Sequence, residues 1–176
     1  MRIHNYREKD LPELVHIQEL AAQEDGTESF NESDFVAWLE DGERPTNTFV
    51  VTDDDDELNP WGPAGTLEGV EGEIVGYTSV QLRRDQQGYH LLCQGTVHPQ
   101  FRRQHVGRLL LVGGLNRARL LADEFEFEAE QERIPVYFEA LLPKSDVGAE
   151  RLAARFEMRA TDEPAPVSMR LYRREL

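Results

Sequence analysis

The sequence predicts an α/β (α+β) fold with a mixed, mostly antiparallel sheet of about six to seven strands flanked by helices. Two observations predict it. Short apolar segments of strand length recur along the whole chain, and helical segments alternate with them only in the second half. The length of 176 residues suits one domain with its own core, so residues 1–176 are expected to form a single unit.

The beginning of the chain predicts two strands and two helices. Residues 2–6 alternate in polarity as a strand does, and residues 48–52 form a second apolar strand. Between them, Asp10 and Glu13 have the spacing of a capping box at the start of a helix. A further helix is predicted over residues 33–40. The apolar faces of these two helices consist of Leu11, Leu14, Ile17, Leu20 and Ala21, and of Phe35, Trp38 and Leu39.

Residues 53–72 are rich in glycine, proline and acidic residues and are predicted to form a surface loop. The aspartates at its start could bind calcium, but their spacing matches no known calcium loop, and a solvated run of charge is the simpler interpretation. No metal site is therefore predicted. Two strands follow at 74–82 and 89–97, joined by a hairpin turn at 85–88.

The longest predicted helix covers residues 104–122 and is apolar on most faces, which indicates burial. Gly113 and Gly114 would weaken an isolated helix, so their expected purpose is close packing on the sheet. Residues 123–133 alternate like a strand but have the composition of a helix, and both possibilities stay open. The remaining elements are a strand, a helix and a closing strand, at 135–143, 147–156 and 167–172.

Charge is distributed unevenly. Residues 1–100 contain 21 acidic and 6 basic residues, which gives −15, whereas residues 101–176 contain 13 of each. This surplus of negative charge argues against a nucleic-acid partner, because most of the surface would repel a phosphate polymer. No apolar run reaches the length of a membrane span and no signal peptide begins the chain, so we expect a cytoplasmic protein without a membrane partner. Cys93 is the single cysteine and is expected to be a small buried residue.

The segment 96–112, T-V-H-P-Q-F-R-R-Q-H-V-G-R-L-L-L-V, combines the end of a strand, a basic loop and the start of a helix. Residues 98–122 contain five arginines and no acidic residue. Unpaired backbone N–H groups and the positive end of the helix dipole would point the same way, so this segment predicts a phosphate site. A basic helix start without a ligand is the alternative.

The same segment resembles the cofactor-binding motif of the GCN5-related N-acetyltransferases. The family pattern Q/R-x-x-G-x-G/A is matched here by Arg102-Arg103-Gln104-His105-Val106-Gly107. The order of elements and the segment F-E-A-L-L-P followed by a short helix are also similar to the family, so the resemblance covers nearly the whole chain. It implies an acyl-CoA N-acyltransferase-like fold.

The resemblance also implies acetyl-CoA as co-substrate. Its pyrophosphate would lie on backbone N–H groups of Arg103, Gln104, His105, Val106, Gly107 and Arg108. The side chains of Arg102, Arg103 and Arg108 would supply countercharge. The pantetheine arm would pair with the backbone near Thr96 and Val97, where the fourth and fifth strands separate in this family.

Two positions depart from the family pattern. His105 occupies the position of a glycine, and a histidine adopts positive φ only at a cost of about 1 kcal/mol. In the helix at 147–156, the residue five positions before Phe156 is Arg151, where the family often has a tyrosine that protonates the leaving thiolate, and Arg155 replaces the glycine that commonly precedes the phenylalanine.

Acetyl transfer to an amine requires a group or a water relay that removes a proton. The candidates in the fourth and fifth strands are His90 and Glu139, each of which could equally be a packing or pocket-lining residue. The acceptor site of this family is built by the first two helices, which here belong to the acidic half. An acidic funnel would favour a cationic amine, polyamine or basic peptide.

The sequence therefore predicts an acetyl-CoA-dependent N-acetyltransferase acting on a primary amine of a small molecule or peptide. The alternative is a catalytically degenerate module that keeps the fold, binds acyl-CoA weakly or not at all, and serves as one half of a tandem protein or of a homodimer. A nucleotide-binding protein of another fold is disfavoured, because the chain contains no G-x-x-x-x-G-K-[ST] motif and no G-x-G-x-x-G motif.

Overall fold

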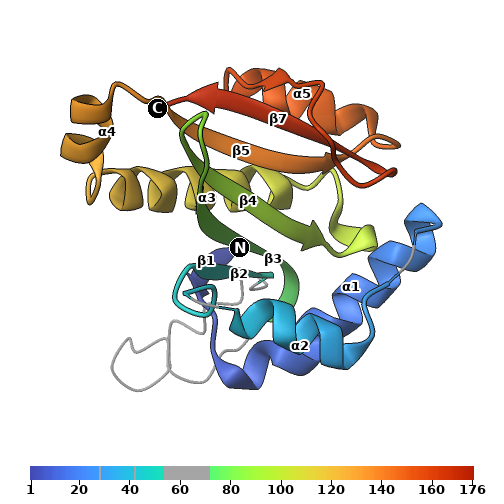
Figure 1. Cartoon of the computed structure of the whole chain (residues 1–176). Helices are drawn as coiled ribbons and strands as arrows, with labels where there is room; N and C mark the ends of the chain where they lie inside the picture. Colours follow the sequence, from blue (N-terminus) through green and yellow to red (C-terminus); the bar gives the residue numbers. More distant parts are fainter. Residues whose placement is uncertain (28, 42, 54–71) are drawn as a thin grey trace.

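A computed structural model describes residues 1–27, 29–41, 43–53 and 72–176 (Figure 1). The strands are β1 (Arg2–Asn5), β2 (Thr48–Asp53), β3 (Glu73–Arg84), β4 (Tyr89–Val97), β5 (Val136–Pro143), β6 (Arg159–Ala160) and β7 (Met169–Glu175). The helices are α1 (Leu11–Asp25), α2 (Glu32–Glu40), α3 (Val106–Ala122), α4 (Glu126–Glu132) and α5 (Val147–Arg155), with short 3-10 turns η1 (Glu8–Asp10) and η3 (Pro99–Phe101). The predicted loop at 53–72 lies, apart from its two end residues, outside the described residues.

All seven strands form one sheet in the order β1-β2-β3-β4-β5-β7-β6. Every neighbouring pair is antiparallel except β4 and β5, which are parallel. This confirms the predicted mixed, mostly antiparallel sheet. The single parallel pair arises because α3 and α4 carry the chain back across the sheet between these two strands.

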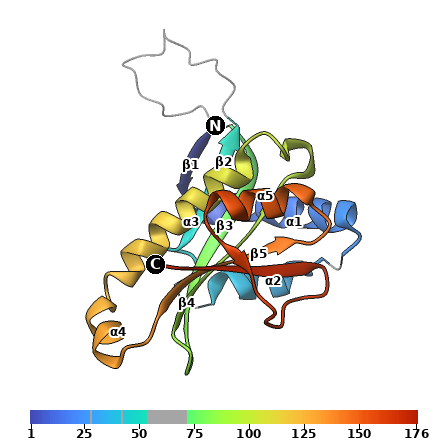
Figure 2. The same cartoon turned by 90° about the horizontal axis from the view of Figure 1, so that it is seen from above.

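Helices cover both faces of the sheet (Figure 1 and Figure 2). On one face, α3, α4 and α5 pack on strand residues that include Leu91 and Phe138. On the other face, α1 and α2 pack on Val50 and Tyr77. Val51, the neighbour of Val50, packs instead with α3, as the alternation of side chains along a strand requires.

The two glycines of α3 provide the close packing that the sequence predicts. A Cβ atom on Gly114 would lie 2.6 Å from Cys93 Sγ, and a Cβ atom on Gly113 would lie 2.7 Å from Ile3 Cδ1. The distance at Gly114 is too short for a real side chain, so α3 approaches β4 closely because this residue is a glycine. At Gly113 the flexible Ile3 side chain, which is 42% exposed, could move away.

Residues 123–133, which the sequence left open, form a turn and the short helix α4. Phe125 and Ala129 are buried four residues apart, and the Phe125 ring stacks on Tyr89 with centroids 4.3 Å apart. Phe127 is 76% exposed, so the alternation of phenylalanines does not reflect a strand. The helical composition of this segment is the better guide.

Asp10 is the N-cap residue of α1, as predicted, but the predicted capping box with Glu13 is wrong. Asp10 Oδ2 accepts a hydrogen bond of 2.8 Å from the backbone N–H of Arg7, and Asp10 makes no side-chain cap to α1. The extra 3-10 turn η1 lies immediately before the helix, so the carboxylate turns back to this preceding turn.

Candidate functional site

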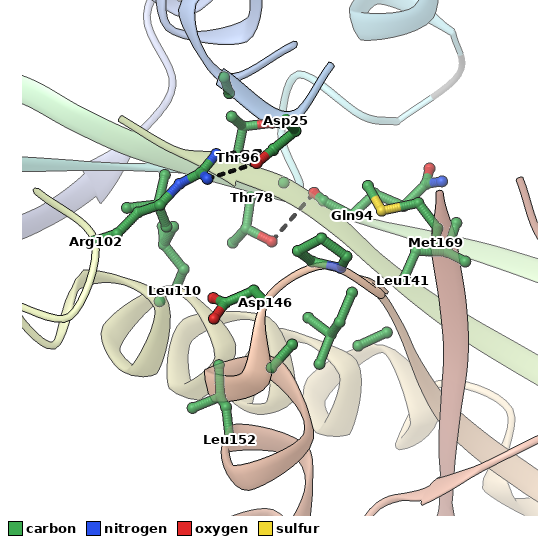
Figure 3. A pocket seen from close by; sticks show the side chains of 18 of the residues that line it. Asp25, Thr78, Gln94, Thr96, Arg102, Leu110, Leu141, Asp146, Leu152 and Met169 are labelled. Carbon is green, nitrogen blue, oxygen red and sulfur yellow. Dashed lines mark hydrogen bonds and ion pairs between the residues drawn. The ribbon is translucent and has the colours of Figure 1, made fainter. Parts of the chain in front are cut away.

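The cavity between β4 and β5 is the main concave feature of the described residues. The two strands pair from Tyr89 opposite Val136 as far as Cys93 opposite Ala140. Beyond these residues they separate, and a cavity of about 1040 Å³ fills the wedge between them (Figure 3). The predicted separation of the fourth and fifth strands is therefore present.

Each strand keeps a neighbour on its outer side only. Gln94–Val97 pair with β3, and Leu141–Pro143 pair with β7. On the side facing the cavity, neither segment has a strand partner among the described residues. Strand edges of this kind can hydrogen-bond an extended ligand that contains amide groups. Thr96 and Val97, both predicted to contact the cofactor, line this part of the cavity.

The turn between β4 and α3 forms one end of the cavity. Arg103 and His105 both have φ = 69°, in the left-handed region. His105 is the N-cap residue of α3, and its side chain makes no capping hydrogen bond. Among the described residues, no side chain accepts a hydrogen bond from the first N–H groups of α3, which suits an anion site.

His105 thus adopts a left-handed backbone conformation, which glycine adopts without strain. Its φ of 69° and ψ of −3° are those of a left-handed residue, and the exposed imidazole lines the cavity. The substitution of glycine by histidine changes the side chain at this position and leaves the turn intact. The positive φ of His105 should therefore destabilise the folded state by about 1 kcal/mol relative to a glycine at this position.

Three other residues of the motif differ in their contributions. Gly107 lines the cavity, and a Cβ atom there would lie 3.6 Å from Leu152, an ordinary contact. Val106 is 1% exposed and packs its side chain against the sheet, so only its backbone N–H can face a ligand. Gln104 is exposed, donates to the carbonyl of Gln100 at 2.9 Å, and does not line the cavity.

Five arginines line the cavity, and two of them bridge it to other elements. Arg102 donates two hydrogen bonds to Asp25 at the end of α1, at 2.7 and 2.9 Å (Figure 3). The hydrogen bond with Asp25 raises the pKa of Arg102 above its usual value. Arg103 donates to Asp146, the N-cap residue of α5, at 2.5 Å.

The other three arginines of the cavity wall are exposed and, within the described part of the chain, have no ion-pair partner. They are Arg108 on α3 and Arg151 and Arg155 on α5. Asp25 and Asp146 are the carboxylates that line the cavity among the described residues. The cavity therefore has a surplus of positive charge in a chain whose net charge is −15.

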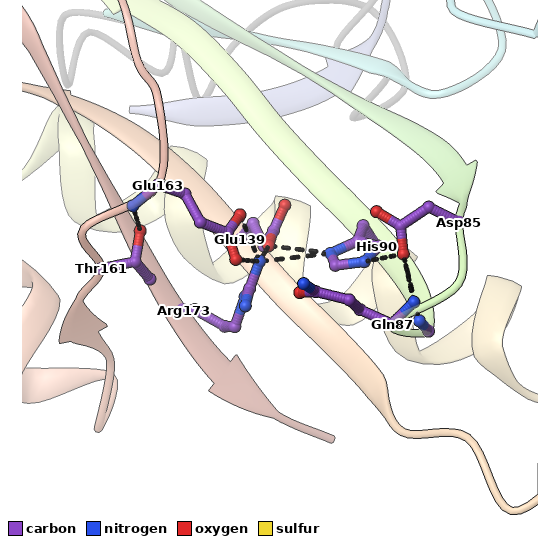
Figure 4. Close-up of polar contacts among 8 residues, drawn as sticks. Asp85, Gln87, His90, Glu139, Thr161, Glu163 and Arg173 are labelled. Atoms are coloured by element: carbon purple, nitrogen blue, oxygen red, sulfur yellow. Dashed lines mark hydrogen bonds and ion pairs between the residues drawn. The ribbon is translucent and has the colours of Figure 1, made fainter.

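His90 and Glu139, the two candidate bases, contact each other outside the cavity (Figure 4). His90 Nδ1 lies 2.9 Å from Glu139 Oε1, and His90 Nε2 lies 3.2 Å from Asp85 Oδ1. Arg173 donates to Glu139 Oε1 at 2.6 Å and to Glu163 at 2.7 Å.

This arrangement leaves neither candidate free. Both ring nitrogens of His90 face carboxylate oxygens, and Oε1 of Glu139 is shared between an imidazole and a guanidinium group. Glu139 directly precedes Ala140, which lines the cavity, but the side chains of neighbouring strand residues point to opposite faces, and Glu139 itself is not a lining residue. The network joins β4, β5, β7 and the β3–β4 hairpin. Neither His90 nor Glu139 lines the cavity, so neither contacts a ligand there directly.

Two protonated groups also lie at the cavity wall. Burial raises the pKa of the Cys93 thiol to about 11, and its Sγ lies 3.0 Å from the hydroxyl of Thr78. Burial likewise raises the pKa of the Tyr77 phenol far above its usual value. Both groups are neutral at physiological pH, so neither serves as a base there.

The structure corrects the register of the helix α5. The left-handed residue that follows the helix is Glu157, with φ = 58°, and the next residue, Met158, is buried. Glu157-Met158 therefore occupies the place that the sequence comparison gave to Arg155-Phe156. Counting back five residues from Met158 gives Ala153, which is 0% exposed and whose side chain has no proton to donate.

Sequence reasoning missed the residues that α1 and α2 contribute to the cavity. Gln18, Asp25, Phe35 and Trp38 all line it. A signal was present for Gln18, because it lies between Ile17 and Ala21 on the apolar side of α1, where a polar residue is unusual.

No family model matches the chain, and no curated protein matches it by sequence. Solved structures match along its whole length. A ribosomal-protein-alanine N-acetyltransferase from Brucella melitensis has a TM-score of 0.62 at 16% identity, with 100% of both chains covered. NAA60 from Arabidopsis thaliana, solved with a bisubstrate analogue, has a TM-score of 0.61 at 12% identity, with 99% of this chain and 98% of that chain covered.

A third match is yncA from Salmonella typhimurium, a putative acetyltransferase solved with its cofactor acetyl-CoA. Its TM-score is 0.59 at 16% identity, and 99% of this chain and 93% of that chain are covered. Together with the sheet order and the separation of β4 from β5, these matches show that the chain has the fold of the GCN5-related N-acetyltransferases.

Within the described residues, no helix is both long and apolar enough to cross a bilayer. The described residues also include no cluster of three or more side chains suited to a metal ion.

Proposed function

We propose that the protein is an acetyl-CoA-dependent N-acetyltransferase that acts on a primary amine. One observation carries the proposal: a single cavity contains two strand edges without partners and, at its end, the uncapped N-terminus of α3. The strand edges suit the amide groups of a pantetheine arm, and the helix terminus suits a pyrophosphate.

The residues present fit this co-substrate. Backbone groups of Thr96 and Val97 would pair with the pantetheine arm, and the N–H groups from Arg103 to Arg108 would surround the pyrophosphate. Arg103 is occupied by Asp146 in this structure, so a phosphate would compete with that carboxylate. The arginines without ion-pair partners, Arg108, Arg151 and Arg155, lie where the remaining phosphate charge can be neutralised.

The reaction forms an N–C bond between the amine and the acetyl carbon and breaks the C–S bond of the thioester. One proton leaves the amine, and one is taken up by the thiolate. His90 and Glu139 remain our candidates for the first proton, and they would act through water because they lie outside the cavity.

One observation favours the second candidate, a module that binds acyl-CoA without turnover. Among the described residues of the cavity wall, both carboxylates are paired with arginines, and Ala153 stands where a proton-donating tyrosine would be expected. Such a module would act as one half of a tandem protein or of a homodimer. Sedimentation with and without acetyl-CoA measures whether residues 1–176 act as a monomer.

Titration calorimetry with acetyl-CoA tests the proposed site. We expect saturable binding to the wild type and to Gly107→Ala, because a methyl group meets Leu152 at an ordinary 3.6 Å. Gly107→Trp fills the end of the cavity and should abolish binding while the far-ultraviolet circular dichroism is unchanged. Absence of wild-type binding at millimolar acetyl-CoA would sink the proposal. Binding without acetylation of a broad amine panel would favour the non-catalytic module.

Glu139→Gln separates a role in proton transfer from a structural role. If Glu139 relays the proton, kcat falls by more than the loss of folded protein explains and its pH profile changes, while KM stays the same. If Glu139 only holds His90 and Arg173, the melting temperature falls and kcat follows the folded fraction. Arg173→Gln, which perturbs the same network from β7, is the matched control.

A further inference from the structure

The part of the cavity formed by α1, α2 and β3 is almost free of charge. The wall consists mainly of Ala21, Ala22, Phe35, Trp38 and Tyr77. Its described acidic residue, Asp25, is neutralised by Arg102 at 2.7 Å. The sequence predicted an acidic funnel for the acceptor in this half of the chain. The described wall of the cavity does not have this acidic character.

Three aromatic rings in this wall hold one another in place. The Phe35 ring stacks on Trp38 with centroids 5.7 Å apart and meets the edge of Tyr77 at 5.6 Å. Arg44 covers Trp38, with its guanidinium carbon 4.5 Å from the ring centroid. Such a wall is rigid and apolar, and it matches a flat or branched hydrocarbon group better than a second charge.

One polar group in this wall has unused hydrogen-bonding capacity. Gln18 is 8% exposed, and its buried Oε1 atom has no hydrogen-bond partner among the residues that the structure describes. A buried amide oxygen without a donor costs about 1–3 kcal/mol, a penalty that a donor on a ligand would remove. Because Gln18 also lines the cavity, a ligand N–H group beside α1 can supply that donor once the amide turns its oxygen toward the cavity.

We propose that the acceptor is a primary amine carried on an apolar or aromatic group, which packs against Trp38 while an N–H group of the acceptor donates to Gln18. Trp38 is the partly exposed ring of this wall, and the buried rings of Phe35 and Tyr77 support it from the core. This inference rests on the proposed acetyltransferase function and specifies its substrate class. The chemistry is shared by free arylalkylamines and by peptides whose first residue has a large apolar side chain. The net charge of −15 would attract either ammonium ion at long range, whereas the wall selects the apolar carrier.

The test compares ligands by saturation-transfer NMR in the presence of CoA, so that binding is measured whether or not the protein turns over. The probes are 2-phenylethylamine, spermidine, and peptides that begin with Phe or with Asp. We expect the apolar probes to bind at least tenfold more tightly than spermidine and the Asp peptide. A comparison of 2-phenylethylamine with the Phe peptide identifies the source of the amine. Equal or tighter binding of spermidine or the Asp peptide overturns the inference.

Two variants locate the effect. Gln18→Leu should weaken apolar-amine binding on the order of tenfold, because it removes the acceptor atom and keeps the volume. Gln23→Leu is the matched control, since Gln23 is an exposed residue of the same helix that does not line the cavity. An unchanged affinity in Gln18→Leu overturns the role of Gln18. Calorimetry with acetyl-CoA on the same samples shows separately whether the proposed function itself holds.

Discussion

His105 shows how one residue can depart from a motif while the structure of the motif is kept. Glycine is usual at such a position because it adopts positive φ without strain. Here the histidine adopts φ = 69°, and the turn around it closes into an uncapped helix start. The backbone requirement and the side-chain requirement of the motif are thus separable.

Substitution of His105 tests this separation. His105→Gly should leave the free energy of unfolding nearly unchanged or slightly higher, whereas His105→Val should lower it by about 1–2 kcal/mol, because a β-branched residue tolerates positive φ poorly. Urea unfolding measures both. At Gln104, whose φ is not positive, the same pair of substitutions should give no such advantage to glycine. Equal stabilities of His105→Gly and His105→Val would contradict the expectation.

Cys93 makes a prediction about pH. Its pKa is about 11 in the folded protein, against about 8.5 for an unfolded chain, so the unfolded state releases the proton first. Stability should therefore fall as the pH rises from about 8.5 to 11, by up to about 1.4 kcal/mol per pH unit from this group. Urea unfolding at several pH values should give a smaller slope for Cys93→Ala than for the wild type, and identical slopes would argue against the raised pKa.

At the scale of elements, α5 is attached to the turn before α3 through one carboxylate. Asp146 accepts a hydrogen bond from the backbone N–H of Gly148 at 2.8 Å and also pairs with Arg103 at 2.5 Å. The same side chain thus caps a helix and occupies an arginine of the proposed phosphate site. Serine at this position would keep the cap and remove the charge.

Asp146→Ser should consequently bind acetyl-CoA more tightly than the wild type, because Arg103 no longer has to leave a carboxylate. Its stability should change little. Asp146→Ala should also free Arg103 but lose about 1 kcal/mol of stability with the cap. Calorimetry and thermal unfolding separate the two effects, and weaker binding by a stable Asp146→Ser protein would show that the ion pair supports the site.

At the scale of the whole molecule, a strongly acidic chain places five arginines around one cavity. We expect Arg108→Gln and Arg151→Gln each to weaken CoA binding about two- to fivefold and to reduce its dependence on salt, as for exposed charge pairs. Arg119→Gln, on the same helix as Arg108 but outside the cavity, is the control. The loss of affinity in these variants should be smaller for dephospho-CoA than for CoA. An equal loss of affinity in Arg119→Gln would contradict a local role of Arg108 and Arg151.

The sequence alone determined the fold class and the strand, loop and helix of the proposed phosphate site. Apolar periodicity is a local property, so the strand 89–97 and the helix 147–156 were predicted within a residue or so of β4 and α5. The turn before α3 was likewise predictable, since strand, basic loop and helix are adjacent in the chain. The bounds of α5 were predicted, but the left-handed residue after the helix was placed at Arg155, two residues too early. Glu157 occupies this position, and without a glycine there the sequence does not mark it.

Only the tertiary structure decided which side chains share the cavity. Asp25 and Arg102 are 77 residues apart, and His90 and Glu139 are 49 apart, so no local pattern could show that the first pair bridges the cavity and the second lies outside it. The aromatic wall and the amide oxygen of Gln18, which has no partner among the described residues, depend on the packing of α1 and α2 against β3. Long-range packing, which local sequence patterns do not encode, therefore determines the character of the proposed acceptor site.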